Sequence, residues 1–408
     1  MVLPRRAASH GASPLLVTGL KAALTALGAA LVFVVTAMGL VSVRVARRVV
    51  TPSPRQSDTT LRGLDAAAQT ITLSRTADTV LPGRYGLFVT GTQQYLKVGS
   101  VLSEDAGTVK RKLLTHVPEG SHLAAEAAFS GWYFSGPEEL HLPFTPELIG
   151  TPVGPCPAWL FPAEGAGDTW VIQVHGRGTT RSECLRAVPV FHAAGITSLL
   201  VSYRNDGEAP RSRAGTYGLG ATEWRDVDAA LGFARRRGAR RIILMGWSMG
   251  GAVVLQVALS SAHAPVVAGI VLDSPVVDWR VVLDYQARLL RLPRPIPELA
   301  IGALKNKWSS RVAGSRAPIP FDSLDVVARA GELRQPTLIL HSDDDGFVPS
   351  DASHLLADAR PDLVELEVFE VARHTKLWNY DQDRWNGTIR RWLDRRGLSG
   401  VSADAGPV

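Results

Sequence analysis

The sequence predicts an α/β fold with a mostly parallel sheet between two layers of helices. After Thr151, short apolar runs alternate with longer helix-like segments. The runs are rich in Val, Ile and Leu along their whole length, which is typical of strands covered on both faces. Strands that alternate with helices form parallel sheets with helices on both sides. The chain has 408 residues, 46% of them hydrophobic, which is enough for a sizeable core.

The first element along the chain is an uncharged apolar segment from Ala22 to Val43. A helix needs about 20 apolar residues to cross a bilayer, whereas the apolar core of a cleaved signal peptide has roughly 7 to 15. The sequence therefore favours a retained single-span anchor within residues 1–50, in the cell membrane, over a signal peptide. Basic side chains flank the segment on both sides, at Arg5, Arg6, Lys21, Arg44, Arg47 and Arg48. Because both flanks are basic, the side of the membrane that carries the body stays open.

Residues 51–150 are predicted to form a linker and a small β-rich accessory region. The linker, residues 51–64, is rich in Pro, Ser and Thr. Short runs of β-branched and aromatic residues follow, broken by Gly and Asp, and they predict a few antiparallel strands. His116, His122 and His141 lie here without partners at metal-ligand spacing, so we interpret them as ordinary surface or half-buried histidines.

The body is predicted over residues 151–398, followed by a flexible tail at 399–408. Its predicted strands are the runs "TWVIQVHG", "ITSLLVSYR", "RIILMGW", "AGIVLDSP", "PTLILHS" and "VELEVFEV". Its predicted helices are "ATEWRDVDAALGFARRRG", "GAVVLQVALSSA" and "DASHLLADAR". In such sheets the functional groups gather at the carboxyl ends of the strands, so we expect the site there.

A serine stands on a glycine-rich turn at the end of one of these strands. Gly246-Trp247-Ser248-Met249-Gly250 fits the pattern G-x-S-x-G between a predicted strand and a predicted helix. The glycines allow a turn too tight for larger side chains, and the serine backbone is then strained. The helix that follows directs unpaired N–H groups toward the same point. The alternative is a packing turn in which Ser248 is merely small.

Four motifs together resemble the α/β-hydrolase superfamily: "GWSMGG", "VHGRG", "HSDDDGFVP" and "ARHTKLWN". The resemblance covers roughly Val153 to Leu398. It implies an α/β-hydrolase fold and a triad in the chain order Ser, Asp or Glu, His, with Ser248 as the nucleophile. It also implies a cap over the site between residues 275 and 335. One crossover helix with a decorated loop is the alternative for that segment.

The resemblance implies His374 as the base and Asp345 as the acid. His374 follows the last strand run on a loop, whereas His354 lies within a predicted helix and is interpreted as a helix-face residue. Asp345 matches the family's Asp-x-x-Val-Pro placement, from which it would orient the imidazole and stabilise its cationic form. Asp343 and Asp344 are expected to hold the loop or meet solvent, with Asp344 as the competitor for the role of the acid.

The backbone N–H groups of Arg177 and Met249 are the implied oxyanion hole, because His175-Gly176-Arg177-Gly178 resembles the family's His-Gly-x loop. His175 is implied to shape this loop and not to carry protons. The side chain of Arg177 is expected either to bind an anionic substrate group at the rim of the site or to be solvated.

Tyr203 and Trp247 are the candidate substrate contacts. Tyr203 belongs to "YRNDGEAP", a loop that borders the cleft in the family. Its neighbours Arg204 and Asp206 are expected to stabilise the loop through salt bridges, with substrate contact as the alternative.

The predicted function is a serine hydrolase that cleaves small-molecule or lipid-like carboxylic esters through an acyl-enzyme. No cofactor and no metal are expected. One alternative is a serine peptidase of the prolyl-oligopeptidase type, because "GWSMGG" also resembles the serine turn of that family. The N-terminal segment of this chain is, however, too short for the propeller domain that those peptidases carry. The other alternative is a membrane-tethered interaction module with an unused site.

The charge pattern argues against nucleic-acid binding. The net charge is +6, but most basic residues are Arg spread along the chain without long runs. Cys156 and Cys184 are the only cysteines and lack zinc-ligand spacing. We interpret them as isolated thiols, with one bond between them as the alternative if the body is exported. The sequence leaves the oligomeric state open.

Overall fold

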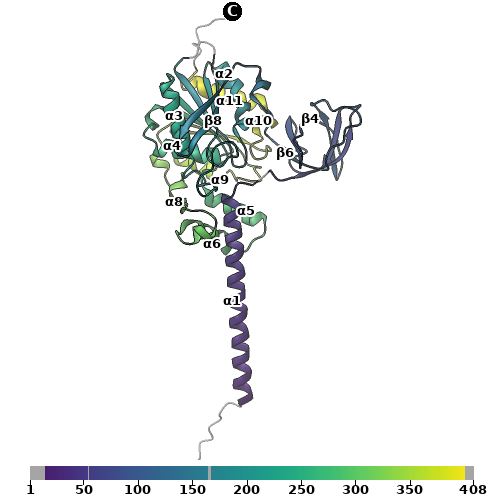
Figure 1. Cartoon of the computed structure of the whole chain (residues 1–408), viewed down its shortest axis with the longest axis vertical. Coiled ribbons are helices and arrows are strands. Elements are labelled where there is room, and N and C mark those ends of the chain that lie inside the picture. The colour runs from purple at the N-terminus through teal and green to yellow at the C-terminus, as the bar shows by residue number, and fades with distance from the viewer. Residues whose placement is uncertain (1–13, 54, 164–166, 400–408) are drawn as a thin grey trace, which may run out of the picture.

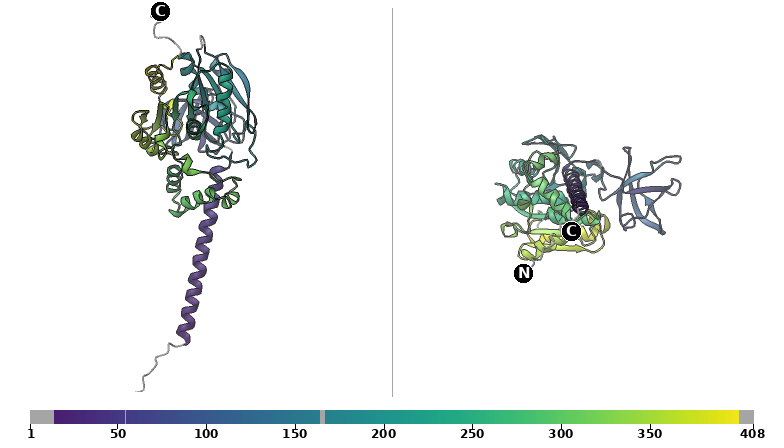
Figure 2. Two further views of the ribbon diagram at one scale, coloured as in Figure 1. Left: turned by 90° about the vertical axis from the view of Figure 1, so that its left-hand side faces the viewer. Right: turned by 90° about the horizontal axis from the view of Figure 1, so that it is seen from below.

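The computed structural model describes residues 14–53, 55–163 and 167–399. It consists of a long N-terminal helix, a small barrel and a larger body with a central sheet (Figure 1). The helix enters the body from one side, and the barrel lies beside the body, off the axis of the helix (Figures 1 and 2). The predicted N-terminal tail up to residue 13 and nearly all of the predicted C-terminal tail lie outside the described residues.

The body is built on an eight-stranded sheet in the order β14-β13-β12-β11-β9-β10-β8-β7. Its strands are β7 (Thr145–Thr151), β8 (Gly154–Phe161), β9 (Thr169–Val174), β10 (Thr197–Val201), β11 (Arg241–Trp247), β12 (Val267–Asp273), β13 (Thr337–Ser342) and β14 (Val364–Phe369). The strands β9 to β14 pair in parallel, whereas β8 is antiparallel to β10 and β7 is antiparallel to β8. The predicted mostly parallel α/β sheet is confirmed.

Helices cover both faces of the sheet, because alternate residues of each strand point to opposite sides. In β11, Ile242 and Leu244 belong to one core cluster with α3, α4 and α9, while Ile243 and Met245 belong to a second with α2 and α11. The helices of the body outside residues 275–335 are α2 (Val188–Ala193), α3 (Trp224–Arg236), α4 (Met249–Ser260), α9 (Asp351–Ala359), α10 (Leu377–Tyr380) and α11 (Gln382–Arg395). Short 3-10 turns add η1 (Pro137–Leu140), η2 (Arg181–Ala187) and η3 (Ala264–Val266).

The sheet begins earlier in the chain than the predicted boundary at residue 151. The strand β7 starts at Thr145 and pairs with β8 along its whole length. Six of its seven residues are exposed or half-buried, and only Ile149 is buried. An edge strand with so little burial has no apolar run, and for this reason the sequence pattern did not reveal it.

The accessory region is a closed six-stranded barrel in the order β1-β2-β5-β4-β3-β6, with all neighbours antiparallel. Its strands are β1 (Thr59–Asp65), β2 (Thr70–Ser74), β3 (Tyr85–Val89), β4 (Tyr95–Glu104), β5 (Thr108–Leu113) and β6 (Glu126–Ser130). The strand β1 starts inside the predicted linker. The barrel encloses its own apolar core, in which the buried Arg111 donates hydrogen bonds to four backbone carbonyls.

The N-terminal helix α1 (Pro14–Val50) ends inside the body. Its residues Ala46 and Val50 are fully buried in the core cluster that also contains the sheet and α4. Four helices and one 3-10 turn occupy the segment predicted as a cap or a decorated crossover: α5 (Trp279–Leu289), α6 (Pro295–Lys305), α7 (Ser309–Val312), α8 (Phe321–Leu324) and η4 (Ala330–Glu332). The helices α5, α6 and α8 group around the point where α1 enters (Figure 1).

Candidate active site

Ser248 stands on the tight turn between β11 and α4. Its backbone has a φ of +50° and a ψ of −117°, a conformation that is strained for a residue with a side chain. A Cβ on Gly246 would lie 2.4 Å from the carbonyl oxygen of Gly250, and one on Gly250 would lie 2.2 Å from that of Val174. Only glycine fits at these two positions. The turn therefore brings the Ser248 hydroxyl to the carboxyl edge of the parallel strands.

A series of hydrogen bonds joins Ser248, His374 and Asp345. Ser248 Oγ lies 2.9 Å from His374 Nε2, and His374 Nδ1 lies 2.7 Å from Asp345 Oδ2. The three residues follow β11, β14 and β13, so the parallel sheet unites groups that are far apart in the chain. Ser248 is 6% exposed and Asp345 is 3% exposed. The series is therefore largely shielded from water.

The environment of Asp345 keeps its carboxylate ionised. Its Oδ1 accepts hydrogen bonds from the backbone N–H groups of Phe347 and Val348, at 2.8 and 2.9 Å. The second oxygen, Oδ2, also faces His341 Nε2 at 3.4 Å. Burial by itself would raise the pKa of Asp345, but His374 and His341 outweigh burial and hold this pKa well below its usual range. The carboxylate can therefore fix the orientation of His374.

The neighbouring acids and the second histidine have other partners. Asp344 pairs with Arg373 at 3.0 Å, at the surface. Asp343 accepts a hydrogen bond from Ser350 and lies 2.9 Å from His354 Nε2 on α9. The structure thus joins Asp345, and not its competitor Asp344, to His374.

The His-Gly loop, residues 175–178, follows β9 and packs against the serine turn. A Cβ on Gly176 would lie 3.3 Å from Ser248 Cβ, so the loop backbone lies beside the hydroxyl. The Gly176 N–H donates to Glu183 Oε2 at 2.7 Å, which holds the loop from behind. The next amide, that of Arg177, and the amide of Met249 at the first position of α4 are the expected oxyanion donors. Amides at the start of a helix have no partner within it.

The family comparison matches the part of the chain that holds this site. The model described as "Alpha/beta hydrolase family" matches residues 171–388, more than half of the chain. The chain belongs to the α/β-hydrolase family. A second model, described as a domain of unknown function (DUF8805), matches residues 60–130, which is the barrel. No curated protein matches the sequence.

Solved structures that are similar to this chain include other hydrolases. An esterase of Pyrococcus furiosus is 18% identical, with a TM-score of 0.50, over 64% of this chain and 94% of that one. A thermophilic esterase of Thermogutta terrifontis is 20% identical, with a TM-score of 0.44, over 62% and 99%. The 2-hydroxy-6-oxo-6-phenylhexa-2,4-dienoate hydrolase of a Rhodococcus strain is 19% identical, with a TM-score of 0.46, over 62% and 99%. At 18% identity, the likeness to the esterase of Pyrococcus furiosus concerns the fold alone.

The side chain of Arg177 in this α/β hydrolase takes neither of the two expected roles. It donates from Nε to the carbonyl oxygen of Val49 at 2.9 Å, and from its terminal nitrogen to those of Arg48 at 2.6 Å and Thr51 at 3.1 Å. The first two carbonyls belong to the last turn of α1, where they lack partners within the helix, and that of Thr51 directly follows the helix. A cation also complements the negative end of the helix dipole. Arg177 therefore ties the His-Gly loop to the end of α1.

The burial of Tyr203 and Trp247 contradicts their expected contact with substrate. Tyr203 is fully buried, stacks on His175 with ring centroids 4.3 Å apart, and donates to the Gly176 carbonyl oxygen at 2.9 Å. Trp247 is also fully buried, in the core on one face of the sheet. Both rings lie beneath the site because their apolar surface fills the core. They shape the site from within.

The residues Arg204 and Asp206 beside Tyr203 hold their loop through side-chain contacts, as the sequence predicts. Arg204 pairs with Asp226 through two side-chain hydrogen bonds of 2.7 and 2.6 Å. Asp206 Oδ2 lies 3.1 Å from His175 Nε2, and its other oxygen accepts backbone N–H groups in its own loop. His175 therefore helps to fix the His-Gly loop.

A buried network beneath His374 was missed by sequence reasoning. Arg186, fully buried, donates to the Thr375 carbonyl oxygen at 2.7 Å and to Asn379 Oδ1 at 2.9 Å. Ser274 Oγ accepts the Thr375 N–H at 3.1 Å and donates to Asp273 at 3.0 Å. Burial raises the pKa of Asp273. Asp273, an acid at the end of an apolar strand run, was a signal in the sequence that could have indicated this network. Arg186 lies in no motif and gave no such signal.

The barrel contacts the segment that follows His374. Asn379 Nδ2 donates to the Arg84 carbonyl oxygen at 2.7 Å, and the Arg84 N–H donates back to the Asn379 carbonyl oxygen at 3.2 Å. Lys376 Nζ forms a salt bridge with Asp78 at 2.8 Å. The barrel therefore braces the histidine side of the site, as α1 braces the His-Gly loop.

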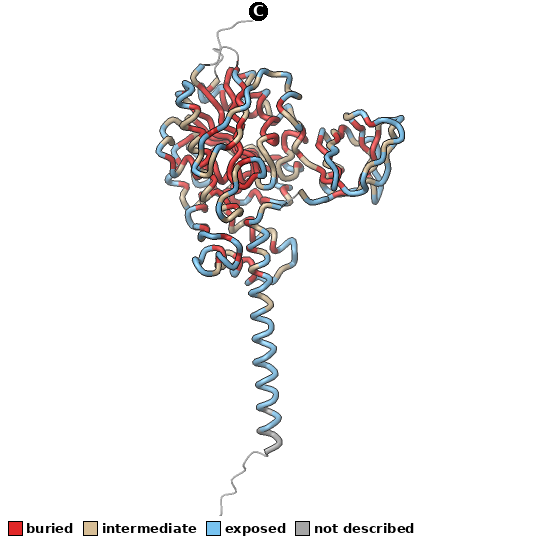
Figure 3. Tube along the Cα trace, in the orientation of Figure 1, coloured by how far each residue is buried: buried red, intermediate tan, exposed pale blue. Residues whose placement is uncertain are grey.

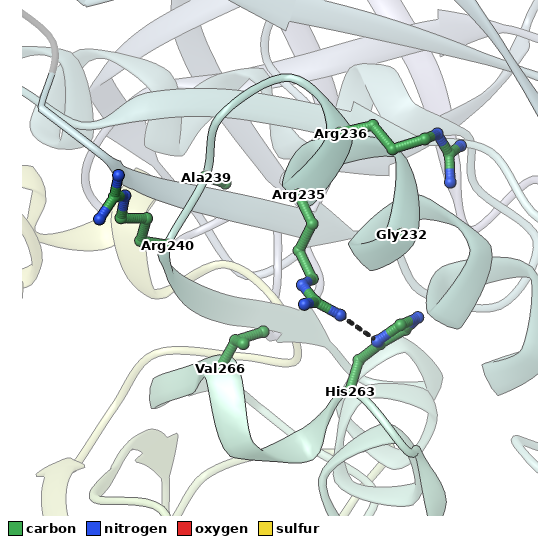
Figure 4. A pocket seen from close by; sticks show the side chains of 7 residues that line it. All are labelled: Gly232, Arg235, Arg236, Ala239, Arg240, His263 and Val266. Carbon is green, nitrogen blue, oxygen red and sulfur yellow. Dashed lines mark hydrogen bonds between the residues drawn. The ribbon is translucent and has the colours of Figure 1, made fainter.

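A hollow in the surface lies apart from the candidate site. A basic surface hollow of about 570 Å³ is lined by Arg235, Arg236, Arg240 and His263, at the amino ends of β11 and β12 (Figure 4). It lies at the opposite edge of the sheet from Ser248.

Both cysteines are buried and free, so they form no disulfide. Within the described residues, no group of three or more His, Cys, Asp or Glu side chains is arranged to hold a metal ion.

Proposed function

We propose that the protein is a membrane-anchored serine hydrolase that cleaves carboxylic esters through an acyl-enzyme intermediate. The observation that carries this proposal is the series of hydrogen bonds from Ser248 through His374 to Asp345. A serine hydroxyl needs such a base within hydrogen-bond reach. The strained turn and the two nearby amides add support, because together they provide a nucleophile and donors for the oxyanion.

In the proposed reaction Ser248 Oγ attacks the ester carbonyl while His374 Nε2 takes its proton. Asp345 keeps the imidazole in place and stabilises its cationic form. The carbonyl oxygen becomes an oxyanion that the N–H groups of Arg177 and Met249 stabilise, by about 3 kcal/mol for a donor of this kind. His374 then protonates the leaving alcohol. Water, activated by the same imidazole, hydrolyses the acyl-enzyme.

The proposed membrane anchor is α1. Within the described residues, Lys21–Val50 is the one helix long and apolar enough to cross a membrane. The apolar side chains between residues 24 and 41 are exposed, apart from the half-buried Ala37 and Met38, which suits lipid and not water. The end of the same helix belongs to the body, because Ala46 and Val50 are buried in its core and Arg177 binds the Val49 carbonyl oxygen. The apolar part of α1 therefore continues without a break into the folded body, which supports a retained anchor.

The proposal is tested by labelling the full chain in detergent with a fluorophosphonate probe. We expect labelling of wild type and none of Ser248→Ala with an unchanged unfolding temperature. Absence of labelling in folded wild type would favour an interaction module. Substrates of matched acyl groups then separate the enzyme classes: ester turnover supports the proposal, whereas amide turnover without ester turnover would favour a peptidase.

A further inference from the structure

The segment from Trp279 to Arg316 carries the entire net charge of the chain. It contains eight basic residues and two acidic ones, a net charge of +6, and the net charge of the whole chain is also +6. The basic residues are Arg280, Arg288, Arg291, Arg294, Lys305, Lys307, Arg311 and Arg316. The rest of the chain is therefore neutral overall, and the excess positive charge is confined to α5, α6, α7 and their connections.

Five of these cations have no counter-ion among the residues that the structure describes. Arg280 and Lys305 pair with Asp322, and Arg288 pairs with Asp284. The others make no ion pair within the part of the chain that the structure describes, and all of them are exposed: Arg291, Arg294, Lys307, Arg311 and Arg316. Unpaired exposed cations in one segment form a surface that attracts anions.

Large apolar side chains are exposed among these cations. Trp308 is 84% exposed, and four further side chains are about half exposed: Leu289, Leu290, Leu299 and Val312. We call the five cations and these five apolar side chains together the cap face. Basic residues interleaved with exposed Trp and Leu are typical of surfaces that lie in the interfacial region of a bilayer.

The cap face begins where the apolar part of α1 ends. Along α1 the side chains from residues 21 to 41 are exposed or half-buried, and Ser42 is the first buried one (Figure 3). These 21 residues form about 30 Å of helix, the thickness of the hydrocarbon core. Beyond them α1 packs against the cap, where Arg47 Nε donates to the Val312 carbonyl oxygen at 2.9 Å. The exposed apolar part of α1 is therefore followed directly by the part of α1 that packs against the cap.

We propose that the cap face is a second membrane contact, which binds anionic phospholipid headgroups and inserts Trp308 and its neighbouring leucines into the interface. The inference rests on the proposal that α1 spans the bilayer. Charge selects the lipid: a cluster of five unpaired cations is complementary to phosphatidylglycerol or a similar anionic headgroup, and exposed apolar side chains beside it suit the acyl boundary.

The contact has a consequence for the candidate site, because the cap touches the loop that carries Asp345. Tyr285 Oη on α5 donates to the Asp345 carbonyl oxygen at 3.3 Å, and Gln286 Nε2 donates to that of Phe347 at 2.8 Å. The Phe347 ring lies 5.2 Å from the His374 ring. A cap held on the bilayer therefore places the site next to esters that reside in the membrane, which are the substrate class that this geometry favours.

The test measures how close the cap face lies to lipid in the full chain. A fluorophore is attached at Trp308→Cys, and the full chain is reconstituted in phosphatidylcholine vesicles with and without phosphatidylglycerol. A spin-labelled lipid in the same vesicles quenches fluorophores at the interface. Both native cysteines are buried and should not react with the label. The matched control is Leu102→Cys, an exposed leucine on β4 of the barrel, away from α1 (Figure 1).

We expect quenching at position 308 to exceed that at position 102 roughly threefold, and to rise with phosphatidylglycerol. Replacing Arg291, Arg294 and Arg311 by Gln should remove the dependence on phosphatidylglycerol. As a control for the loss of positive charge, Arg235, Arg236 and Arg240 at the hollow in Figure 4 are also replaced by Gln. This variant should keep the dependence of the quenching on phosphatidylglycerol unchanged.

Flotation of the same vesicles separates the two proposals. If the chain floats but position 308 is quenched no more than position 102, α1 is an anchor and the cap face faces something other than lipid, so this inference is wrong. If the chain does not float with either lipid mixture, the anchor itself is wrong and the inference falls with it. Fluorophosphonate labelling of each variant reports whether the hydrolase body remains folded.

Discussion

The end of α1 and the barrel both brace the candidate site, but through different chemistry. The end of α1 is part of the hydrolase core: Val50 is fully buried there, and Arg177 binds the last carbonyls of the helix. The barrel has a core of its own and meets the body through polar contacts, such as the salt bridge between Lys376 and Asp78, and through Tyr380 of α10, which packs against the barrel core. The helix end is therefore an integral part of the body, whereas the barrel is a separate unit docked on it.

This difference predicts unequal costs when each contact is broken. Burial of apolar side chains in a shared core supports the whole body cooperatively, so damage at the helix end spreads to the site. A partly exposed polar interface contributes little by itself. We therefore expect substitutions at the end of α1 to affect the stability and activity of the body far more than substitutions at the interface with the barrel.

The largest effect is expected for Val50→Asp, which puts an unpaired charge into the core. The body should lose roughly 3 to 5 kcal/mol of its free energy of unfolding, because a buried carboxylate without a partner is costly. Thermal unfolding in detergent, followed by fluorophosphonate labelling, measures the loss. The matched substitution is Val98→Asp, equally buried in the barrel core. It should unfold the barrel and leave Ser248 reactive. Equal loss of labelling in both variants would contradict the comparison.

The next effect is expected for Arg177→Gln, which releases the His-Gly loop from α1. The backbone N–H at this position would shift from the oxyanion, and we expect kcat for a soluble ester to fall about 10- to 100-fold with KM nearly unchanged. Arg177→Lys keeps a charge that can still bind the carbonyls and should recover part of the activity. If kcat of the Gln variant equals that of wild type, the end of α1 does not position this loop.

A smaller effect concerns the acid side of the pH range. The folded pKa of Asp345 lies below its ordinary value, because His374 and His341 outweigh burial. This group therefore stabilises the body at pH values above about 4, its ordinary pKa, and loses that contribution as the pH falls toward the folded pKa. Unfolding measured from pH 6 down to about pH 2 should show a shallower acid limb for Asp345→Asn than for wild type. Identical slopes would contradict the assignment.

The smallest effect is expected for Lys376→Gln at the interface with the barrel. The salt bridge to Asp78 is partly exposed, so its loss should cost about 0.5 kcal/mol and change kcat less than about twofold. Steady-state kinetics and thermal unfolding of this variant beside Arg177→Gln give the direct comparison of the two braces. A larger loss of kcat in Lys376→Gln than in Arg177→Gln would reverse our conclusion about which brace matters more.

Local pattern was enough to predict the parallel strands of the sheet and the residues that form the candidate site. Apolar runs marked β9 to β14, since a strand buried on both faces must be apolar throughout. The edge strand β7 has one buried side chain and escaped notice for the same reason. The predicted Ser248, His374 and Asp345 lie within hydrogen-bond distance of one another, while their catalytic role stays a prediction. Tyr203 and Trp247 were misplaced because proximity to a site in the sequence does not say whether an aromatic side chain points to the surface or into the core, where both are buried.

By itself, the sequence determined the α/β class, the apolar length of α1 and the strained serine turn, because these depend on neighbouring residues and their periodicity. Only the tertiary structure decided that Arg177 binds the end of α1, more than 120 residues away in the chain, and that five cations of the cap have no ion-pair partner within the described residues. Such contacts join distant segments whose local sequences carry no trace of one another. They form only when the sheet has brought these segments to one edge.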